Sequence, residues 1–180
     1  TGTHSINTDG FRGYIFHAGP EKKFPFPDSE FIRMWIADME FAVAPEIREA
    51  IIERVNRRIY GYTIMSGNEY YNAFSDWCDK KYGWHCAQEE LTFSSGVIPA
   101  LYQLVEILCA PNEKAVMLTP AYGFFQHAAE YSNIRYECSD MLISDKGNFS
   151  INFEDLENKL ADPAAKLLIW CNPHNPSGNL

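Results

Sequence analysis

The strongest constraint on the fold is the alternation of short apolar segments with helical patterns that runs from Leu91 to Cys171. The expected strands are residues 91–93, 115–119, 134–138 and 167–171, and the expected helices are residues 99–109, 124–131 and 153–160. Such alternation is typical of α/β proteins, in which helices cover both faces of a parallel sheet. The sequence therefore predicts an α/β fold with a mainly parallel sheet flanked by helices.

Two helical patterns precede this alternating region. Apolar residues recur at helical spacing between Pro45 and Ile59, and Gly61 is expected to end that helix. A second pattern covers residues 68–82 and is followed by Gly83. The expected organisation is an extended N-terminal arm over residues 1–43, a helical segment over 44–90 and the first part of a large domain over 91–180.

Charge and composition exclude several classes of protein. The chain has 180 residues and a formal net charge of -9, and no stretch clusters lysines and arginines strongly enough to form a basic stripe, so a nucleic-acid partner is not expected. No apolar run reaches the roughly 20 residues that a membrane helix needs, so we expect no membrane contact and a cytoplasmic location. The five cysteines have wide, irregular spacings that favour reduced thiols over disulfides or a metal site.

A turn of small residues, Ser94-Ser95-Gly96, precedes the helix expected over residues 99–109. The amino end of a helix leaves N–H groups unpaired and carries a partial positive charge, so a phosphate group can bind there. A purely local explanation is also open, in which Ser95 caps the helix and Gly96 only permits the turn.

Tyr122 follows the expected strand 115–119, within Thr119-Pro120-Ala121-Tyr122-Gly123. Ligands of open α/β sheets bind at the carboxyl ends of the strands, where an aromatic side chain can lie against a flat cofactor ring. Tyr122 is therefore a candidate stacking residue. The alternative is a tyrosine that packs on the next helix.

The most specific segment is Asn172-Pro173-His174-Asn175-Pro176-Ser177-Gly178, which follows the last expected strand. Its two Asn-Pro steps restrict the backbone and expose an amide side chain at a strand end, where the amide can bond to a planar ligand. His174 is a candidate for acid-base chemistry, but its place between prolines favours a role in shaping the turn.

This last segment resembles the Asn-Pro-x-Asn-Pro-[Thr/Ser/Val]-Gly signature of class I and II aminotransferase-fold enzymes. In addition, the segments 35–41 (Trp-Ile-Ala-Asp-Met-Glu-Phe) and 60–63 (Tyr-Gly-Tyr-Thr) resemble those of the MalY/PatB subgroup of cystathionine β-lyases. The resemblance covers about residues 30 to 180. It implies the pyridoxal-phosphate-dependent transferase fold (fold type I).

The resemblance also implies roles for individual residues. Backbone N–H groups of Gly96, Val97 and Ile98 would bind the phosphate of pyridoxal 5'-phosphate, Tyr122 would stack on its pyridine ring, and Asn172 would hydrogen-bond to its 3-oxygen. Tyr62 would reach the cofactor phosphate of a neighbouring subunit, which implies a homodimer with shared active sites. Ala37 would lie near the carboxylate of an amino-acid substrate.

No catalytic residue is expected within the chain, because the lysine that forms the Schiff base in this family would lie beyond residue 180. Lys80, Lys81 and Lys114 are interpreted as surface charges. The implied activity of the complete protein is carbon-sulfur β-lysis of cystathionine or cysteine-like amino acids, with release of a thiol, pyruvate and ammonia. The alternatives are an aminotransferase that uses a 2-keto acid, and a non-catalytic fragment or regulator that retains the fold.

Overall fold

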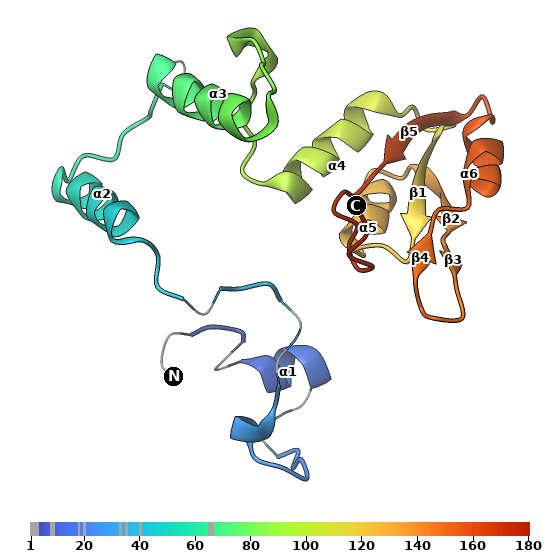
Figure 1. Cartoon of the computed structure of the whole chain (residues 1–180), viewed down its shortest axis with the longest axis horizontal. Helices are drawn as coiled ribbons and strands as arrows, with labels where there is room; N and C mark the ends of the chain where they lie inside the picture. The colour runs from blue at the N-terminus through green and yellow to red at the C-terminus, as the bar shows by residue number, and fades with distance from the viewer. Residues whose placement is uncertain are drawn as a thin grey trace. The chain divides into compact units, whose positions relative to one another are not determined.

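The chain forms two units, residues 1–64 and residues 65–180 (Figure 1). The computed structural model describes residues 4–7, 10–17, 19, 21–32, 34, 36–39, 41–64 and 67–180. The expected domain boundaries after residues 43 and 90 remain a prediction.

The second unit contains a three-stranded parallel sheet in the order β2-β1-β5 and a two-stranded antiparallel hairpin, β3-β4. Its elements are α3 (Asn68–Tyr82), a 3-10 turn (Gln88–Glu90), α4 (Val97–Leu108), β1 (Lys114–Thr119), α5 (Phe124–Tyr131), β2 (Arg135–Asp140), β3 (Leu142–Ile143), β4 (Phe149–Ser150), α6 (Phe153–Leu160) and β5 (Ala165–Ile169). The predicted α/β architecture with a parallel sheet flanked by helices is confirmed.

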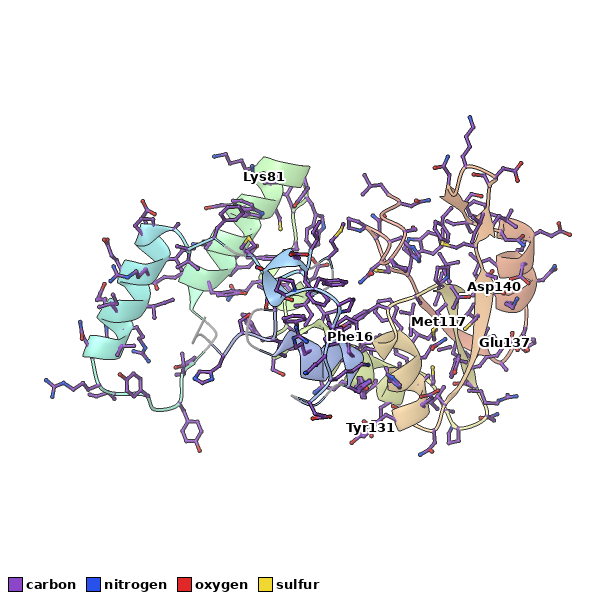
Figure 2. All side chains as sticks on the ribbon, turned by 90° about the horizontal axis from the view of Figure 1, so that it is seen from below. Phe16, Lys81, Met117, Tyr131, Glu137 and Asp140 are labelled. Atoms are coloured by element: carbon purple, nitrogen blue, oxygen red, sulfur yellow. The ribbon has the colours of Figure 1, made fainter. Side chains whose placement is uncertain are left out.

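Alternate side chains of β1 enter two separate hydrophobic clusters, because successive residues of a strand point to opposite faces of the sheet. Ala115 and Met117 pack with residues of α4 and α5, whereas Val116 and Leu118 pack with Leu156 of α6. Figure 2 shows Met117 within a dense group of side chains. β1 is therefore the buried central strand, with a helical layer on each face.

Gly83 ends α3 as the sequence predicts. It adopts a left-handed conformation, with φ 61°, and its N–H group donates to the carbonyl of Asp79 at 2.9 Å. Glycine reaches this conformation without a steric penalty, which makes it a favoured residue just past a helix. The helix expected over residues 68–82 is confirmed at both ends.

The first unit contains α1 (Phe11–Phe16), a 3-10 turn (Asp28–Glu30) and α2 (Pro45–Asn56). The arm carries its own aromatic cluster, in which the ring of Phe31 lies 4.7 to 6.0 Å from four other phenylalanine rings. The short helix α1 was not expected, since residues 1–43 show no helical period. No helix among the residues that the structure describes is long and apolar enough to cross a membrane.

Two expected features of the backbone are wrong. α2 ends at Asn56 and not near Gly61, because the hydroxyl of Tyr60 and the N–H of Arg58 both donate to the Val55 carbonyl, which would otherwise accept from the next helical turn. Residues 91–93 form no strand, since no described segment pairs with them. Instead, the ring of Phe93 lies 4.7 Å from that of Tyr70 on α3.

Candidate functional site

The amino end of α4 has no side-chain cap. Gly96 occupies the N-cap position, and neither it nor Ser95 caps the helix through a side chain. The only nearby side-chain bond runs from the Ser94 hydroxyl to the carbonyl of Gly96, at 3.0 Å. The local alternative, in which Ser95 caps the helix, is therefore wrong.

Three backbone donors remain at this helix end. Ala100 is the first residue whose N–H group bonds within the helix, to the carbonyl of Gly96 at 3.1 Å, and Pro99 has no N–H group. The N–H groups of Gly96, Val97 and Ile98 have no acceptor among the residues that the structure describes. These donors and the partial positive charge of the helix end fit an anion such as a phosphate group.

Tyr122 lies in the loop between β1 and α5, and 41% of its surface is exposed. One part of its ring contacts the next helix, with centroid distances of 5.2 Å to Phe124 and 5.9 Å to Phe125. Tyr122 thus packs on the next helix, as one interpretation expects, and also keeps part of its ring surface exposed, as the other requires. The rings of Phe124 and Phe125 contact Tyr122 at the strand end, and the rest of its surface stays exposed.

Asn172 follows β5 and borders a cavity of about 170 Å³. Its side chain is exposed and has no hydrogen-bond partner among the described residues. His174 borders the same cavity but is only 6% exposed, and its Nδ1 atom lies 2.7 Å from the hydroxyl of Ser177. This contact supports the interpretation of His174 as a residue that shapes the turn.

The loops that carry Tyr122 and Asn172 leave the sheet at the same edge. β1 and β5 are parallel neighbours with Met117 opposite Ile169, so the carboxyl ends of both strands lie together. The short segment between Leu108 and Lys114 joins the carboxyl end of α4 to the opposite, amino edge of the sheet. The amino end of α4 therefore points away from the amino edge of the sheet. In other α/β proteins, helix ends and loops with this orientation face a common ligand.

Ala37 and Tyr62 belong to the first unit. Both are exposed and lie outside helices and strands. The backbone beside Ala37 is held by the buried side chain of Asn7, whose amide nitrogen donates to the carbonyl of Ile36 at 3.2 Å. Trp35 and Glu40, which belong to the same sequence motif as Ala37, lie outside the described residues.

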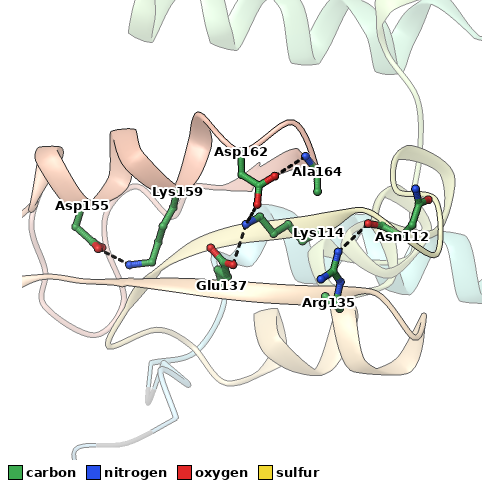
Figure 3. A network of polar contacts seen from close by, with 8 residues as sticks. All are labelled: Asn112, Lys114, Arg135, Glu137, Asp155, Lys159, Asp162 and Ala164. Atoms are coloured by element: carbon green, nitrogen blue, oxygen red, sulfur yellow. Dashed lines mark hydrogen bonds and ion pairs between the residues drawn. The ribbon is translucent and has the colours of Figure 1, made fainter.

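Lys114 is not the surface charge that the sequence favoured. It is 4% exposed, and its ammonium group lies 2.6 Å from Asp162 and 2.8 Å from Glu137 (Figure 3). The hydrogen bonds to Asp162 and Glu137 raise the pKa of Lys114. The sequence signal for this buried position was a charged residue at the start of an apolar strand. The partners of Lys114 could not be recognised in the sequence, because they come from distant parts of the chain.

The sequence interpretation also gave no role to Ser177 and Asn179. Asn179 donates from its side-chain nitrogen to the carbonyl of Phe149 at 2.7 Å, which ties the loop after β5 to the hairpin. No group of three histidine, cysteine, aspartate or glutamate side chains within the described part of the chain is arranged to hold a metal ion.

These features define an α/β protein with helices on both faces of a parallel sheet. An uncapped helix end and loops at the carboxyl edge of such a sheet are where α/β proteins bind ligands. The chain belongs to the aminotransferase class I and II family, whose model matches residues 29–180. It is 39% identical over 153 residues to cystathionine beta-lyase PatB of Bacillus subtilis, and this match covers 85% of the chain and 39% of PatB.

Solved structures of pyridoxal-phosphate enzymes are also similar to this chain. The PLP-bound C-S lyase of Staphylococcus hominis matches 97% of the chain and 41% of its own length, with 38% identity and a TM-score of 0.82. Cystalysin of Treponema denticola, which contains a pyridoxal 5'-phosphate cofactor, matches 98% of the chain and 42% of its own length, with 25% identity and a TM-score of 0.82. The chain thus spans about two fifths of the length of these relatives.

Proposed function

We propose that the protein to which this chain belongs binds pyridoxal 5'-phosphate at the carboxyl edge of the sheet. The N–H groups of Gly96, Val97 and Ile98 bind the phosphate, the ring of Tyr122 lies against the pyridine ring, and the Asn172 amide donates to the 3-oxygen. This assignment is supported by groups that are available for a ligand. The three N–H groups and the Asn172 amide have no hydrogen-bond partner among the described residues, and the ring of Tyr122 is partly exposed.

The net charge of the chain bears on how a phosphate can be bound at the end of α4. The chain carries a formal net charge of -9, which by itself disfavours an anionic ligand. Backbone donors at a helix end supply positive potential locally, without a lysine or arginine. The phosphate is therefore held by backbone N–H groups, and substitutions that change only the side chains there are expected to have small effects.

For the reaction, we propose cleavage of the carbon-sulfur bond of cystathionine or a similar amino acid. The bond between Cβ and sulfur breaks, the sulfur leaves as a thiol, and uptake of one water molecule yields pyruvate and ammonia. Pyridoxal phosphate, when bound, supplies the electron sink that stabilises a carbanion at Cα. The residues of this chain bind and orient the cofactor, and the likeness to PatB and to the lyase of Staphylococcus hominis favours sulfur substrates.

We further infer a homodimer in which Tyr62 reaches the cofactor phosphate of the neighbouring subunit and Ala37 lies near the substrate carboxylate. Both residues are exposed in the first unit, and the Tyr62 side chain has no hydrogen-bond partner among the described residues. An exposed tyrosine with a free hydroxyl group is suited to a contact between subunits.

The experiment is an assay of the full-length protein with cystathionine, with and without added pyridoxal phosphate. Release of thiol and pyruvate in equal amounts, dependent on the cofactor, is the expected result. If the protein transfers the amino group to a 2-keto acid and releases no thiol, it is an aminotransferase and not a lyase, and the cofactor assignment still holds. Absence of cofactor binding would contradict the whole proposal and favour a non-catalytic protein.

The loop after β5 contains three asparagines, and two of them, Asn172 and Asn175, each precede a proline, which allows a matched test of the residue that contacts the 3-oxygen. An N172A variant should raise the pH at which the absorbance of the bound cofactor changes, because a hydrogen bond to an anionic oxygen lowers its proton affinity. The N175A variant changes the same type of residue three positions further on. If N175A shifts this pH and N172A does not, the assignment to Asn172 is wrong.

A further inference from the structure

A turn near the amino end of the chain carries a buried asparagine. The backbone N–H of Asn7 donates to the Ser5 hydroxyl at 3.2 Å, and the N–H of Gly10 donates to the Ser5 carbonyl at 3.3 Å. Only 6% of Asn7 is exposed, and its side-chain nitrogen donates to the carbonyl of Ile36 at 3.2 Å. This bond joins the turn to a segment that lies 29 positions further along the chain.

The oxygen atom of the Asn7 amide has no partner. This Oδ1 atom is buried and accepts no hydrogen bond from the described residues. A buried acceptor without a donor destabilises the folded state, because it loses its bonds to water and gains none in return. Packing alone would be served as well by an apolar side chain of the same branched shape, such as leucine. What asparagine supplies and leucine lacks is the donor to the Ile36 carbonyl.

The bond from Asn7 fixes the peptide group between Ile36 and Ala37. This peptide group is trans, so its carbonyl oxygen and its amide hydrogen point in opposite directions within one plane. The carbonyl faces the buried Asn7 amide, and the N–H of Ala37 therefore points away from it. Ala37 is exposed, and its N–H has no acceptor among the described residues. The peptide group thus presents one oriented, unpaired donor on an exposed residue.

We propose that Asn7 is a positioning residue for substrate binding. Its bond to the Ile36 carbonyl holds the Ala37 N–H in the direction from which it donates to the carboxylate of the amino-acid substrate. Direction matters here because a bond from an N–H group to a carboxylate is stronger than a bond to a neutral acceptor. This inference rests on the proposed function, in which Ala37 lies near the substrate carboxylate. Asn7 itself contacts neither the substrate nor the cofactor.

Two variants of the full-length protein separate the donor of Asn7 from its packing. N7L keeps the branched shape without the donor and the unpaired acceptor, whereas N7A also removes volume. Asn158 on α6 is exposed, so N158L is the matched control. With pyridoxal phosphate bound, each protein is titrated with L-alanine and with ethylamine, which has no carboxylate. The absorbance of the cofactor gives the dissociation constants, and urea midpoints report stability.

We expect N7L and N7A to weaken binding of L-alanine by about three- to tenfold. This is less than the effect of deleting a hydrogen bond to a charged group, because the Ala37 N–H is still present but is no longer held in one direction. Binding of ethylamine and of pyridoxal phosphate should not change. The urea midpoint should fall for N7A, which leaves a cavity, and change little for N7L, in which the lost bond and the lost unpaired acceptor offset each other.

The outcomes distinguish this inference from the proposed function. If the unchanged protein binds no pyridoxal phosphate, or binds it and does not respond to L-alanine, both are wrong. If it binds both and N7L has the same dissociation constant for L-alanine as the unchanged protein and N158L, only the role of Asn7 is wrong. A loss that N7L shows equally for ethylamine, or a loss confined to the less stable N7A, would reduce Asn7 to a packing residue and overturn the inference.

Discussion

The ammonium group of Lys114 lies 2.6 Å from Oδ2 of Asp162, although 48 positions separate the two residues in the chain. The same ammonium group lies 2.8 Å from Glu137 on β2, and the backbone N–H of Lys114 donates to the carbonyl of Ala164. Lys114 thus joins the beginning of β1 to β2 and to the segment before β5. This junction is at the amino edge of the sheet, opposite the candidate site.

Replacing Lys114 by methionine is expected to destabilise the protein. The change removes the buried cation that the carboxylates of Glu137 and Asp162 share and leaves these two like charges close to each other. Both carboxylates are close to half exposed, so water weakens their repulsion without abolishing it. Lys146 is an exposed lysine in the hairpin turn, so K146M is the matched control. Urea denaturation of the full-length protein should show a clearly lower midpoint for K114M, and equal midpoints for the two variants would contradict the prediction.

The contribution of Asp162 should depend on pH. The hydrogen bond from Lys114, followed by that from the N–H of Ala164, holds the pKa of Asp162 below its ordinary value of 3.8. A carboxyl group with a lowered pKa in the folded state stabilises it above the unfolded pKa, and this stability is lost as the pH falls through the folded pKa. The difference in stability between the unchanged protein and D162N should therefore be full at neutral pH and shrink below 3.8.

The measurement for Asp162 is a set of urea midpoints at pH values from neutral to strongly acid. The contribution of Lys114 to stability is lost at the alkaline end of the pH range. Its pKa is raised above 10.5, so this contribution disappears only as the pH rises through the pKa of the folded state. A difference between the two proteins that stays constant down to the most acid pH would refute the assignment of the lowered pKa.

The packing of α6 on the sheet predicts how much stability is lost when its buried leucine is truncated. Leu156 is 4% exposed and packs with Val116, Leu118 and Met141 on one face of the sheet. Truncating it to alanine should reduce the free energy of unfolding by about 2–5 kcal/mol through lost burial and a residual cavity. N158A on the same helix is exposed and should change it by less than about 0.5 kcal/mol. Similar losses for both would show that α6 does not cover this face in the full-length protein.

The elements that could be predicted from the sequence are those whose signals are local. The helix Asn68–Tyr82 ends before a glycine in the left-handed conformation, and its bounds follow from periodicity and from Gly83. The end of α2 could not be predicted in the same way. There the left-handed residue is Arg58, with φ 55°, and the decisive contact is the side chain of Tyr60 returning to Val55.

Long-range partners explain why the ion pairs of Lys114 could not be predicted. The sequence shows that Lys114 begins an apolar strand, but not that Glu137 and Asp162 lie beside it once the sheet forms. The turn from Ser144 to Asn148, with Gly147 at φ 78°, was a readable hairpin signal that the strand pattern left out. For the candidate site, Tyr122 and Asn172 could be proposed because they follow segments that form strands, and the end of α4 could be proposed from its turn of small residues. The bond between His174 and Ser177 requires the folded loop.

The end of α4 allows a test of phosphate binding that changes a single backbone group. Val97 is the first residue of the helix, a position that proline favours, and Gly96 before it has an extended backbone that is compatible with a following proline. V97P therefore removes one N–H group and keeps the helix, while V97A keeps the N–H group and removes most of a side chain that is 80% exposed. The two variants separate the backbone donor from the side chain.

In the full-length protein, V97P should weaken binding of pyridoxal phosphate by about ten- to hundredfold relative to V97A, the usual effect of losing a hydrogen bond to a charged group. Binding of pyridoxal, which has no phosphate, should be the same in both variants. Equal affinities of V97P and V97A for pyridoxal phosphate would show that this N–H group does not contact the phosphate. A loss that extends equally to pyridoxal would mean that the proline distorts the site, and the backbone assignment would then have to be abandoned in favour of a packing effect.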